Sequence, residues 1–465
     1  MGTEKELSLK NFFIFKRLYG CREEEQIKKI LYYFPISDNT DVQIKNVGLA
    51  EGIIQFAETF KPSSPVNALH TNTTRQLYFQ PETDVWFVMT LNLALTTNIK
   101  ESVSTSEYLQ DDLQDNIYEA RLKQAYYMYR LFCDCILKSI EDSHEEILKS
   151  RLELFFNAYL VNMNLSNCDI LDLLLGIQYM PLDKQTFLNV QCFISMLECK
   201  FDFIERCLFL YNEHVIWNGL EPTDLQIIYQ YLIRTLLPAN VETELKGGSV
   251  PRNLPSPFAA SQNGRFITGP TNLKQAKVVG KVPKVHLFSV GTAKEYHLII
   301  YRSLSATVCL FVKGEVELTL DMFKEVNDFM VFKLVEVVTD IAEFCSKRSV
   351  VPSNHPETTP RFIYFDKTNK AYRSTVHLDN KRSGNICCNI ESLRIIADMN
   401  ENKHLLGPVG ESIVKTMNEF WVVSKTSNSR EFYVVLQQKN ASLIEISEEV
   451  KKLCDSELKG IFFHS

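Results

Sequence analysis

The amino-acid sequence predicts an α+β fold that consists of three α/β/α sandwich domains with mostly antiparallel sheets. The main observation is a pattern that occurs three times, at residues 11–60, 204–237 and 361–400, where two short apolar segments precede an amphipathic one. Apolar runs bounded by turn residues are typical of covered strands, and apolar spacing of three to four is typical of helices. The length of 465 residues also fits about three domains of roughly 150 residues each. Helices that follow strands in this order pack on the faces of a sheet.

The first domain is expected over residues 8–165. Its first two strands, Asn11–Lys16 and Lys29–Phe34, are almost continuously apolar or aromatic, as strands covered on both faces are. Asp41 is the expected N-cap of a helix that runs to about Phe60. The remaining predicted elements are strands at Val66–His70, Gln76–Phe79 and Val85–Leu93 and helices at Glu107–Lys138 and Glu145–Val161.

The second domain, with connecting helices, is expected over residues 166–350. Asn212-Glu213 is the predicted turn between strands Ile204–Tyr211 and His214–Trp217. A helix follows, with Pro222 in its first turn and Pro238 as its stop. Gly, Pro, Ser and Asn are frequent in residues 246–283, which predicts a long surface loop. The remaining predicted elements are strands at Val285–Val290, Tyr296–Tyr301 and Thr307–Val312 and a helix at Leu318–Phe344.

The third domain is expected over residues 355–465. Ser442 and Glu445 have the spacing of a capping box, which predicts the start of the last helix, Leu443–Cys454. The other predicted elements are strands Arg361–Phe365 and Tyr372–Leu378, a helix at Ile386–Met399, and a hairpin of Phe420–Lys425 with Arg430–Gln437.

The composition is that of a globular cytoplasmic protein. A net charge of −7 disfavours a general nucleic-acid-binding role, because phosphate neutralisation needs a basic surface. The 12 cysteines include no C-x-x-C pair, so we expect reduced thiols in the core and no zinc site or disulfide. We find no signal peptide, no complete myristoylation signal and no apolar segment long enough to span a bilayer, so any membrane association is expected to be peripheral.

A search for reactive motifs predicts neither catalytic residues, nor a metal site, nor a cofactor. The sequence lacks the P-loop, the dinucleotide-binding glycine motif, G-x-S-x-G and H-E-x-x-H. The acidic pairs Asp111-Asp112 and Glu448-Glu449 are neighbours in sequence, so they do not share a helix face as a catalytic dyad would. An enzyme with an unrecognised site is the least favoured class.

The helix before Phe60 has an apolar arc that is wider than one sheet covers. One stripe consists of Leu49, Ile53, Phe56 and Phe60, and an adjoining stripe consists of Val47, Ala50, Ile54 and Ala57. Two interpretations stay open: the excess contacts a partner chain, with Gly48 and Gly52 allowing close approach, or it is buried under other helices of this chain. The first predicts that Ile54→Asp abolishes partner binding with the fold intact, and the second predicts unfolding.

A modestly basic segment lies near the predicted loop of the second domain. Its residues are Arg265, Lys274, Lys277, Lys281 and Lys284. Such a cluster can meet anionic lipid head groups such as phosphoinositides, but a solvated polar loop is the favoured interpretation.

Several segments resemble one known family. They are NFFIFKRLYG, KILYYFP, IKNVGLAEGIIQF, CLFLYNEHVIWNGLEP, RFITGP and the C-terminal block EFWVVSK…REFYVVLQQKNASLIEISEEVKKLC…IFF. In order and spacing they resemble the Ccz subunit of the Mon–Ccz vacuolar and late-endosomal fusion complex. The resemblance is thinnest near residues 98–107, 246–264 and 381–411.

The resemblance implies three longin-type domains and a role as one subunit of a guanine-nucleotide exchange factor for a late-endosomal or lysosomal Rab GTPase. It further implies an obligate Mon partner, pairing of the first longin domains to present the Rab-binding surface, and a third regulatory subunit. No catalytic side chains define this family. The contact residues expected on this basis are Val47, Ala50, Ile53, Ile54 and Ala57. The alternative is a longin-type trafficking adaptor without exchange activity, which shares the fold.

Overall fold

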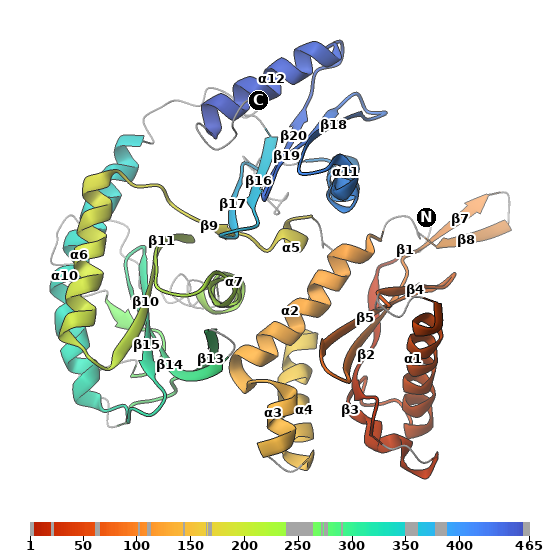
Figure 1. Cartoon of the computed structure of the whole chain (residues 1–465), viewed down its shortest axis with the longest axis horizontal. Coiled ribbons are helices and arrows are strands. Elements are labelled where there is room, and N and C mark those ends of the chain that lie inside the picture. Colours follow the sequence, from red (N-terminus) through yellow and green to blue (C-terminus); the bar gives the residue numbers. More distant parts are fainter. Residues whose placement is uncertain are drawn as a thin grey trace. The chain divides into compact units, whose positions relative to one another are not determined.

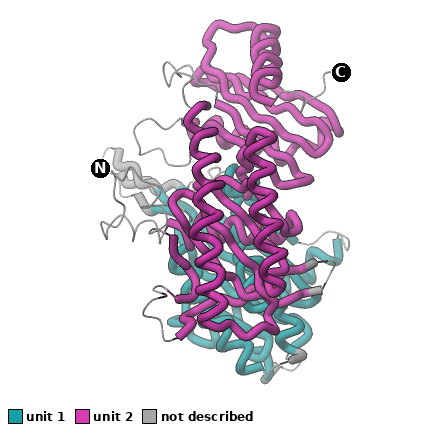
Figure 2. The backbone as a smooth tube through the Cα atoms, turned by 90° about the vertical axis from the view of Figure 1, so that its left-hand side faces the viewer, with its two compact units in different colours: residues 1–174 teal, residues 175–465 magenta. Residues whose placement is uncertain are grey.

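The structure, a computed structural model, divides into two compact units, residues 1–174 and 175–465 (Figure 2). No helix among the described residues is long and apolar enough to cross a bilayer. The described ranges are 4–19, 23–60, 66–100, 103–108, 113–142, 145–163, 165, 170–238, 264–270, 273, 278–289, 292–348, 361–376 and 388–458.

Strands and helices alternate along the chain much as the sequence predicts (Figure 1). The strands are β1 (Glu4–Lys5), β2 (Ser8–Lys16), β3 (Ile30–Phe34), β4 (Ala68–His70), β5 (Thr74–Glu82), β6 (Val85–Asn92), β7 (Leu95–Lys100), β8 (Val103–Tyr108), β9 (Ile177–Gln178), β10 (Ile204–Tyr211), β11 (His214–Asn218), β12 (Arg265–Phe266), β13 (Lys284–Ser289), β14 (Thr292–Ser303), β15 (Ala306–Lys313), β16 (Arg361–Asp366), β17 (Ala371–Ser374), β18 (Val409–Lys415), β19 (Trp421–Ser427) and β20 (Arg430–Leu436). The helices are η1 (Glu23–Lys29), α1 (Thr40–Phe60), α2 (Asp115–Cys133), α3 (Ile136–Asp142), α4 (Glu145–Val161), α5 (Ile170–Leu174), α6 (Lys184–Lys200), α7 (Pro222–Tyr231) with its π-helical extension η2 (Leu232–Leu236), α10 (Leu320–Arg348), α11 (Ile390–Glu401), η3 (Asn402–Leu406) and α12 (Leu443–Glu457).

The three main sheets share one topology, which confirms the predicted threefold repeat. Their strand orders are β3-β2-β6-β5-β4, β11-β10-β15-β14-β12 and β18-β19-β20-β16-β17-β9, and β13 also pairs with β14. Numbered in chain order without β13 and β9, the first two sheets read 2-1-5-4-3, and the third reads the same from its other end, with β9 added at that end. Described strand pairs are antiparallel apart from β9 with β17 and a single bridge from Tyr179 to Val215. The α+β prediction is therefore confirmed.

In unit 1, α1 covers one face of the sheet, and α2 and α4 cover the other (Figure 1). The second face is lined with aromatic rings, and the ring centroids of Phe12, Phe87 and Phe156 lie within 6 Å of one another. Glu82 at the end of β5 accepts hydrogen bonds from the backbone N–H groups of Ile136 and Leu137, both at 2.8 Å. A carboxylate at this position satisfies the first donors of α3.

In unit 2, each of the two large sheets has helices on both faces (Figure 1). Helices α6 and α10 bury one side of the second-domain sheet, and α7 lies on the other side. In the third domain α12 covers one face, and α11 covers the opposite one. The capping box of Ser442 and Glu445 is present as predicted, and so are the turn at Asn212-Glu213 and Pro222 in the first turn of α7.

The segment that contains β9 joins the second and third domains inside unit 2. Ile177 donates its N–H to the carbonyl of Lys370 beside β17 (2.8 Å), and Met180 donates to the carbonyl of Val215 in β11 (3.0 Å). A Cβ at Gly176 would lie 2.1 Å from Cβ of Tyr372, so this close approach requires glycine. One short segment therefore extends both sheets.

A buried carboxylate organises the third domain. Glu431 is 1% exposed and accepts hydrogen bonds from Lys367 (2.8 Å), Lys403 (2.9 Å) and Asn400 (2.7 Å). Burial opposes ionisation, but the two lysines outweigh it and hold the pKa of Glu431 below its ordinary value.

Several predicted boundaries are wrong. The helix expected from Glu107 begins at Asp115, because residues 103–108 form β8, which pairs with β7 in a hairpin that the sequence interpretation missed. Helix α1 begins at Thr40, and its first turn is closed by the carbonyl of Asn39, not capped by Asp41. The compact unit 1 ends at Leu174, because α5 packs on α2, and the expected domain boundary at 165 stays a prediction. Within the expected loop at 246–283, β12 pairs with β14 and Phe266 is buried.

Candidate partner-binding face of the first domain

Helix α1 has apolar residues on two opposite faces, and the structure shows which of them faces its own sheet. Val47, Ala50 and Ile54 are at most 2% exposed and form one cluster with residues such as Phe13 and Trp86. Their spacing of three and four residues places them in a single row along the helix. This row anchors α1 to the first domain.

The expectation that Val47, Ala50 and Ile54 are contact residues is therefore corrected, because a side chain enclosed by its own sheet cannot reach another protein. Ile53 and Ala57 lie at the margin of the helix and are half-buried. Of the two open interpretations of the apolar arc, burial under other helices of this chain is wrong for Leu49, Phe56 and Phe60, which are exposed. Contact with a partner chain stays a prediction.

The opposite side of α1, which we name the α1 outer face, consists of Val42, Gly48, Leu49, Gly52, Phe56 and Phe60. Leu49, Phe56 and Phe60 are 58%, 66% and 74% exposed. The Phe56 and Phe60 rings meet edge to face, with 4.8 Å between their centroids. A Cβ built on Gly48 or Gly52 would meet no atom within 4 Å, so both glycines leave open space on this side. Lys45 contributes a charge among them.

Ion pairs and hydrogen bonds fix the helix at its flanks. Lys29 pairs with Glu51 at 2.7 Å, and Arg17 pairs with Glu58 at 2.8 Å. Near the start of α1, the Tyr33 hydroxyl donates to Asp38 (3.0 Å) and accepts from Asn46 (2.7 Å).

Burial, together with the neighbouring Asp38, raises the pKa of Tyr33 to about 12, so this hydroxyl keeps its proton at neutral pH. The flanking groups hold α1 in one orientation and leave its apolar outer face to solvent. An apolar helix face with small residues is suited to packing against another helix.

The basic segment of the second domain is only partly described. Lys274 and Lys277 lie outside the described residues, and Lys281 is exposed. Arg265 and Lys284 belong to strands of the sheet, not to a free loop. Lys284 pairs with Glu295 at 2.6 Å, and this hydrogen bond holds the pKa of Glu295 below its ordinary value. Lipid binding by this segment stays a prediction.

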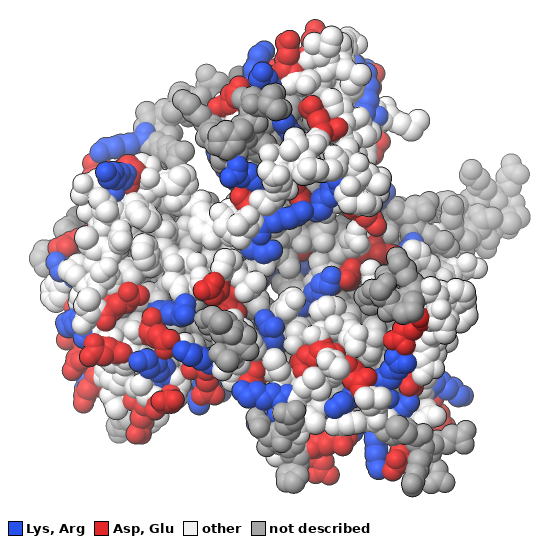
Figure 3. Space-filling model, viewed as in Figure 1, with Lys and Arg blue, Asp and Glu red and all other residues white. Residues whose placement is uncertain are grey.

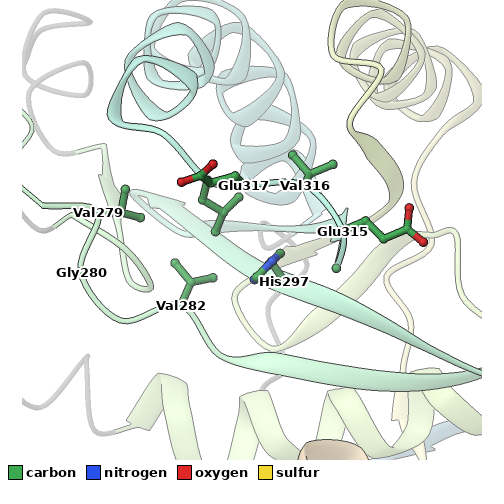
Figure 4. A pocket seen from close by; sticks show the side chains of 9 residues that line it. Val279, Gly280, Val282, His297, Glu315, Val316 and Glu317 are labelled. Atoms are coloured by element: carbon green, nitrogen blue, oxygen red, sulfur yellow. The ribbon is translucent and has the colours of Figure 1, made fainter.

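A shallow pocket lies beside this segment, with a volume of about 390 Å³. Its lining includes Val279, Val282, His297, Glu315 and Glu317, and Figure 4 shows the two carboxylates on opposite sides of the His297 ring. Burial, followed by the charge of Lys284, lowers the pKa of His297, which favours the neutral imidazole at pH 7. The acid and base groups do not converge on one point.

Among the described residues, neither the distribution of charge nor the placement of metal-ligating side chains indicates a second functional site. Acidic and basic side chains are interspersed over the face seen in Figure 3, without a broad basic surface. Within the part of the chain that the structure describes, no cluster of three or more His, Cys, Asp or Glu residues is placed to hold a metal ion.

Comparisons with known proteins support the threefold architecture. A family model described as the first Longin domain of INTU, CCZ1 and HPS4 matches residues 9–134. Models described as Intu longin-like domain 2 and Intu longin-like domain 3 match residues 204–331 and 356–453. The three units inferred from the repeat are thus longin-like domains.

Curated proteins named vacuolar fusion protein CCZ1 homolog are similar over almost the whole chain. The Xenopus tropicalis protein is 39% identical over 457 residues, which cover 98% of this chain and 97% of that protein. The Nematostella vectensis protein is 40% identical over 456 residues, 98% of each chain. The Dictyostelium discoideum protein is 25% identical over 461 residues, again 98% of each.

Proposed function

Because this chain belongs to the CCZ1 family of vacuolar fusion proteins, we propose that it is one subunit of a heterodimeric guanine-nucleotide exchange factor. In this proposal a Mon-type subunit is its obligate partner, and the pair activates a late-endosomal or lysosomal Rab GTPase. The resulting activity promotes endosome maturation, vacuole or lysosome fusion, and autophagy. The complex acts from the cytoplasm after peripheral recruitment to these membranes.

The observation that carries the proposal is the α1 outer face. Three large apolar side chains, Leu49, Phe56 and Phe60, are more than half exposed on one side of a helix whose other side is fixed to its own sheet. Exposed apolar patches of this kind mark protein interaction sites. Gly48 and Gly52 leave room for a partner backbone to approach closely.

Exchange requires a binding surface and no covalent chemistry. A GTPase holds its nucleotide through backbone amides, a lysine and a magnesium ion. A protein that binds the nucleotide-free form more tightly than the loaded form weakens nucleotide binding by linkage. We propose that the paired first domains supply this surface, with Ile53 and Ala57 at the margin of the contact.

The test measures release of a fluorescent guanine nucleotide from the late-endosomal Rab. The chain alone, the Mon-type subunit alone and the co-expressed pair are compared. We expect acceleration by the pair only. Phe60→Asp on the α1 outer face should reduce pair formation at least tenfold. Phe332→Asp is the matched control, because Phe332 on α10 is exposed to the same degree, 73% against 74%.

A well-formed pair that leaves nucleotide release unchanged would refute the exchange proposal and favour the second candidate, a trafficking adaptor built on the same domains. The same face supports that alternative, since partner binding is common to both. We further propose a third regulatory subunit and contact with an anionic phosphoinositide membrane. Lys281 is the described residue of the basic segment that is exposed and lies off the strands.

A further inference from the structure

Helix α4 of unit 1 also has apolar residues on two opposite faces. Its inner row, Leu148, Leu152, Phe156 and Leu160, is buried against the first domain. On the other side lie Ile147, Leu154, Ala158 and Val161, and Leu154 and Val161 are 78% and 77% exposed. A surface helix is normally polar on the side away from its core.

The exposed residues have the spacing of a helix-pairing seam. Positions 147, 151, 154, 158 and 161 follow one another at intervals of four and three residues, which is the period that keeps one side of a helix facing a second helix. We name this row the α4 seam. Its occupants are Ile, Arg, Leu, Ala and Val.

Opposite charges lie on the two sides of Leu154, the central residue of the seam. At about 100° per residue, Arg151 lies roughly 60° to one side of Leu154, and Glu153 lies roughly 100° to the other. Both side chains are exposed, and neither has an ion pair among the described residues. Lys149 and Glu145 pair with each other at 2.8 Å. Arg151 and Glu153 are thus available for charges on a partner.

We propose that the α4 seam binds an amphipathic helix of a partner protein. The partner's apolar residues pack on Ile147, Leu154 and Val161, an acidic residue faces Arg151, and a basic residue faces Glu153. This interface is separate from the α1 outer face and does not depend on exchange activity.

Charge argues against other occupants of the seam. A second copy of this chain could match Leu154 with Leu154 in an antiparallel pair, but the two-fold axis would also bring Glu153 against its own copy. An anionic membrane is disfavoured because α4 carries three acidic and two basic residues, a net charge of −1.

The test measures binding of synthetic helical peptides to the full-length chain by fluorescence anisotropy. All peptides have Leu at seam spacing, and their flanks are one Glu row and one Lys row, two Glu rows, or two Lys rows. We expect the mixed peptide to bind about fivefold more tightly than either single-sign peptide, as two exposed ion pairs allow. Arg151→Glu should shift the preference to the Lys-flanked peptide, and Glu153→Lys should shift it to the Glu-flanked one.

Leu154→Asp should weaken binding at least tenfold, and Val161→Asp provides a second variant in case the first disturbs the fold. Phe332→Ala, on α10 and outside both proposed surfaces, should leave peptide binding unchanged. Equal binding of the three peptides overturns the proposal. Self-association or vesicle binding that Leu154→Asp removes would also overturn it. Slow thiol labelling of Leu154→Cys in the isolated chain would overturn it too, because another part of the same chain would then cover the seam.

Discussion

Ile54 and Phe56 lie two residues apart on α1 and face opposite sides, so they offer a matched pair of truncations. Ile54 is 1% exposed within the core of the first domain, and Phe56 is 66% exposed on the α1 outer face. We expect Ile54→Ala to destabilise the domain and Phe56→Ala to leave it stable while weakening partner binding.

The magnitudes follow from burial. Ile54→Ala removes three buried carbon atoms, about 0.8 kcal/mol each, and leaves a cavity, so the cost should be about 3 kcal/mol. Phe56 keeps only a third of its surface covered, so truncation loses about 0.5–1 kcal/mol of burial. The higher helix propensity of alanine stabilises the folded helix by about 0.5 kcal/mol. The net effect of Phe56→Ala on folding is therefore at most about 0.5 kcal/mol.

The assay is native-state hydrogen exchange of peptides that cover residues 40–60, measured in the full-length chain for the wild type and both variants. The free energy of opening of α1 should fall by about 3 kcal/mol for Ile54→Ala and stay nearly constant for Phe56→Ala. Affinity for the Mon-type subunit is then measured with Phe56→Ala, and a loss of about 1–3 kcal/mol is expected if the ring is a central contact.

Two results would refute this reasoning. Equal destabilisation by the two variants would mean that the outer face of α1 is covered within this chain. Unchanged affinity of Phe56→Ala for the Mon-type subunit, with the fold intact, would remove the α1 outer face from the partner interface.

Three further predictions concern single residues. Glu431→Gln should lower the free energy of unfolding by about 1–3 kcal/mol at pH 7. Because the folded pKa of Glu431 lies below its ordinary value of 4.5, the stabilisation is complete above pH 4.5 and is lost as the pH falls through the folded pKa. Urea unfolding should therefore show the stabilities of wild type and variant converging in acid. Gly176→Val should force Tyr372 away and separate β9 from β17, which should be seen as faster proteolysis at residues 175–180. Unchanged proteolysis would contradict the conclusion that the β9 segment extends both sheets. Gly48→Ala should stabilise α1 by about 0.5–1 kcal/mol in thermal unfolding, because its Cβ meets open space. It should nevertheless weaken pairing with the Mon-type subunit if the partner backbone approaches there. Tighter pairing would argue against this close approach.

Local chemistry predicted many elements correctly. Strand β10 was expected with its observed bounds, Ile204–Tyr211, because the apolar run Cys207–Tyr211 ends at an Asn-Glu turn. The capping box at Ser442 fixed the start of α12 in the same way. These features depend on neighbouring residues only, so they can be read without the rest of the fold.

Elements that depend on distant partners were missed. Strands β7 and β8 are rich in Thr, Ser and Asn, and no apolar alternation marks them. The pairing of β9 with β17 joins residues almost two hundred positions apart and rests on backbone hydrogen bonds, which leave no side-chain pattern. Phe266 was assigned to a loop because Gly, Pro and Ser surround it, but it lies in β12, which pairs with β14 in the sheet.

The sequence by itself determined that the chain has three similar α/β units, that α1 has a wide apolar arc, and which family the chain resembles. Only the tertiary structure decided which part of that arc is inside. Helical periodicity places Val47, Ala50 and Ile54 on one row and Leu49, Phe56 and Phe60 on another, but both rows are apolar and either could face a sheet. The position of the sheet buries the first row, so the second is the one exposed to solvent.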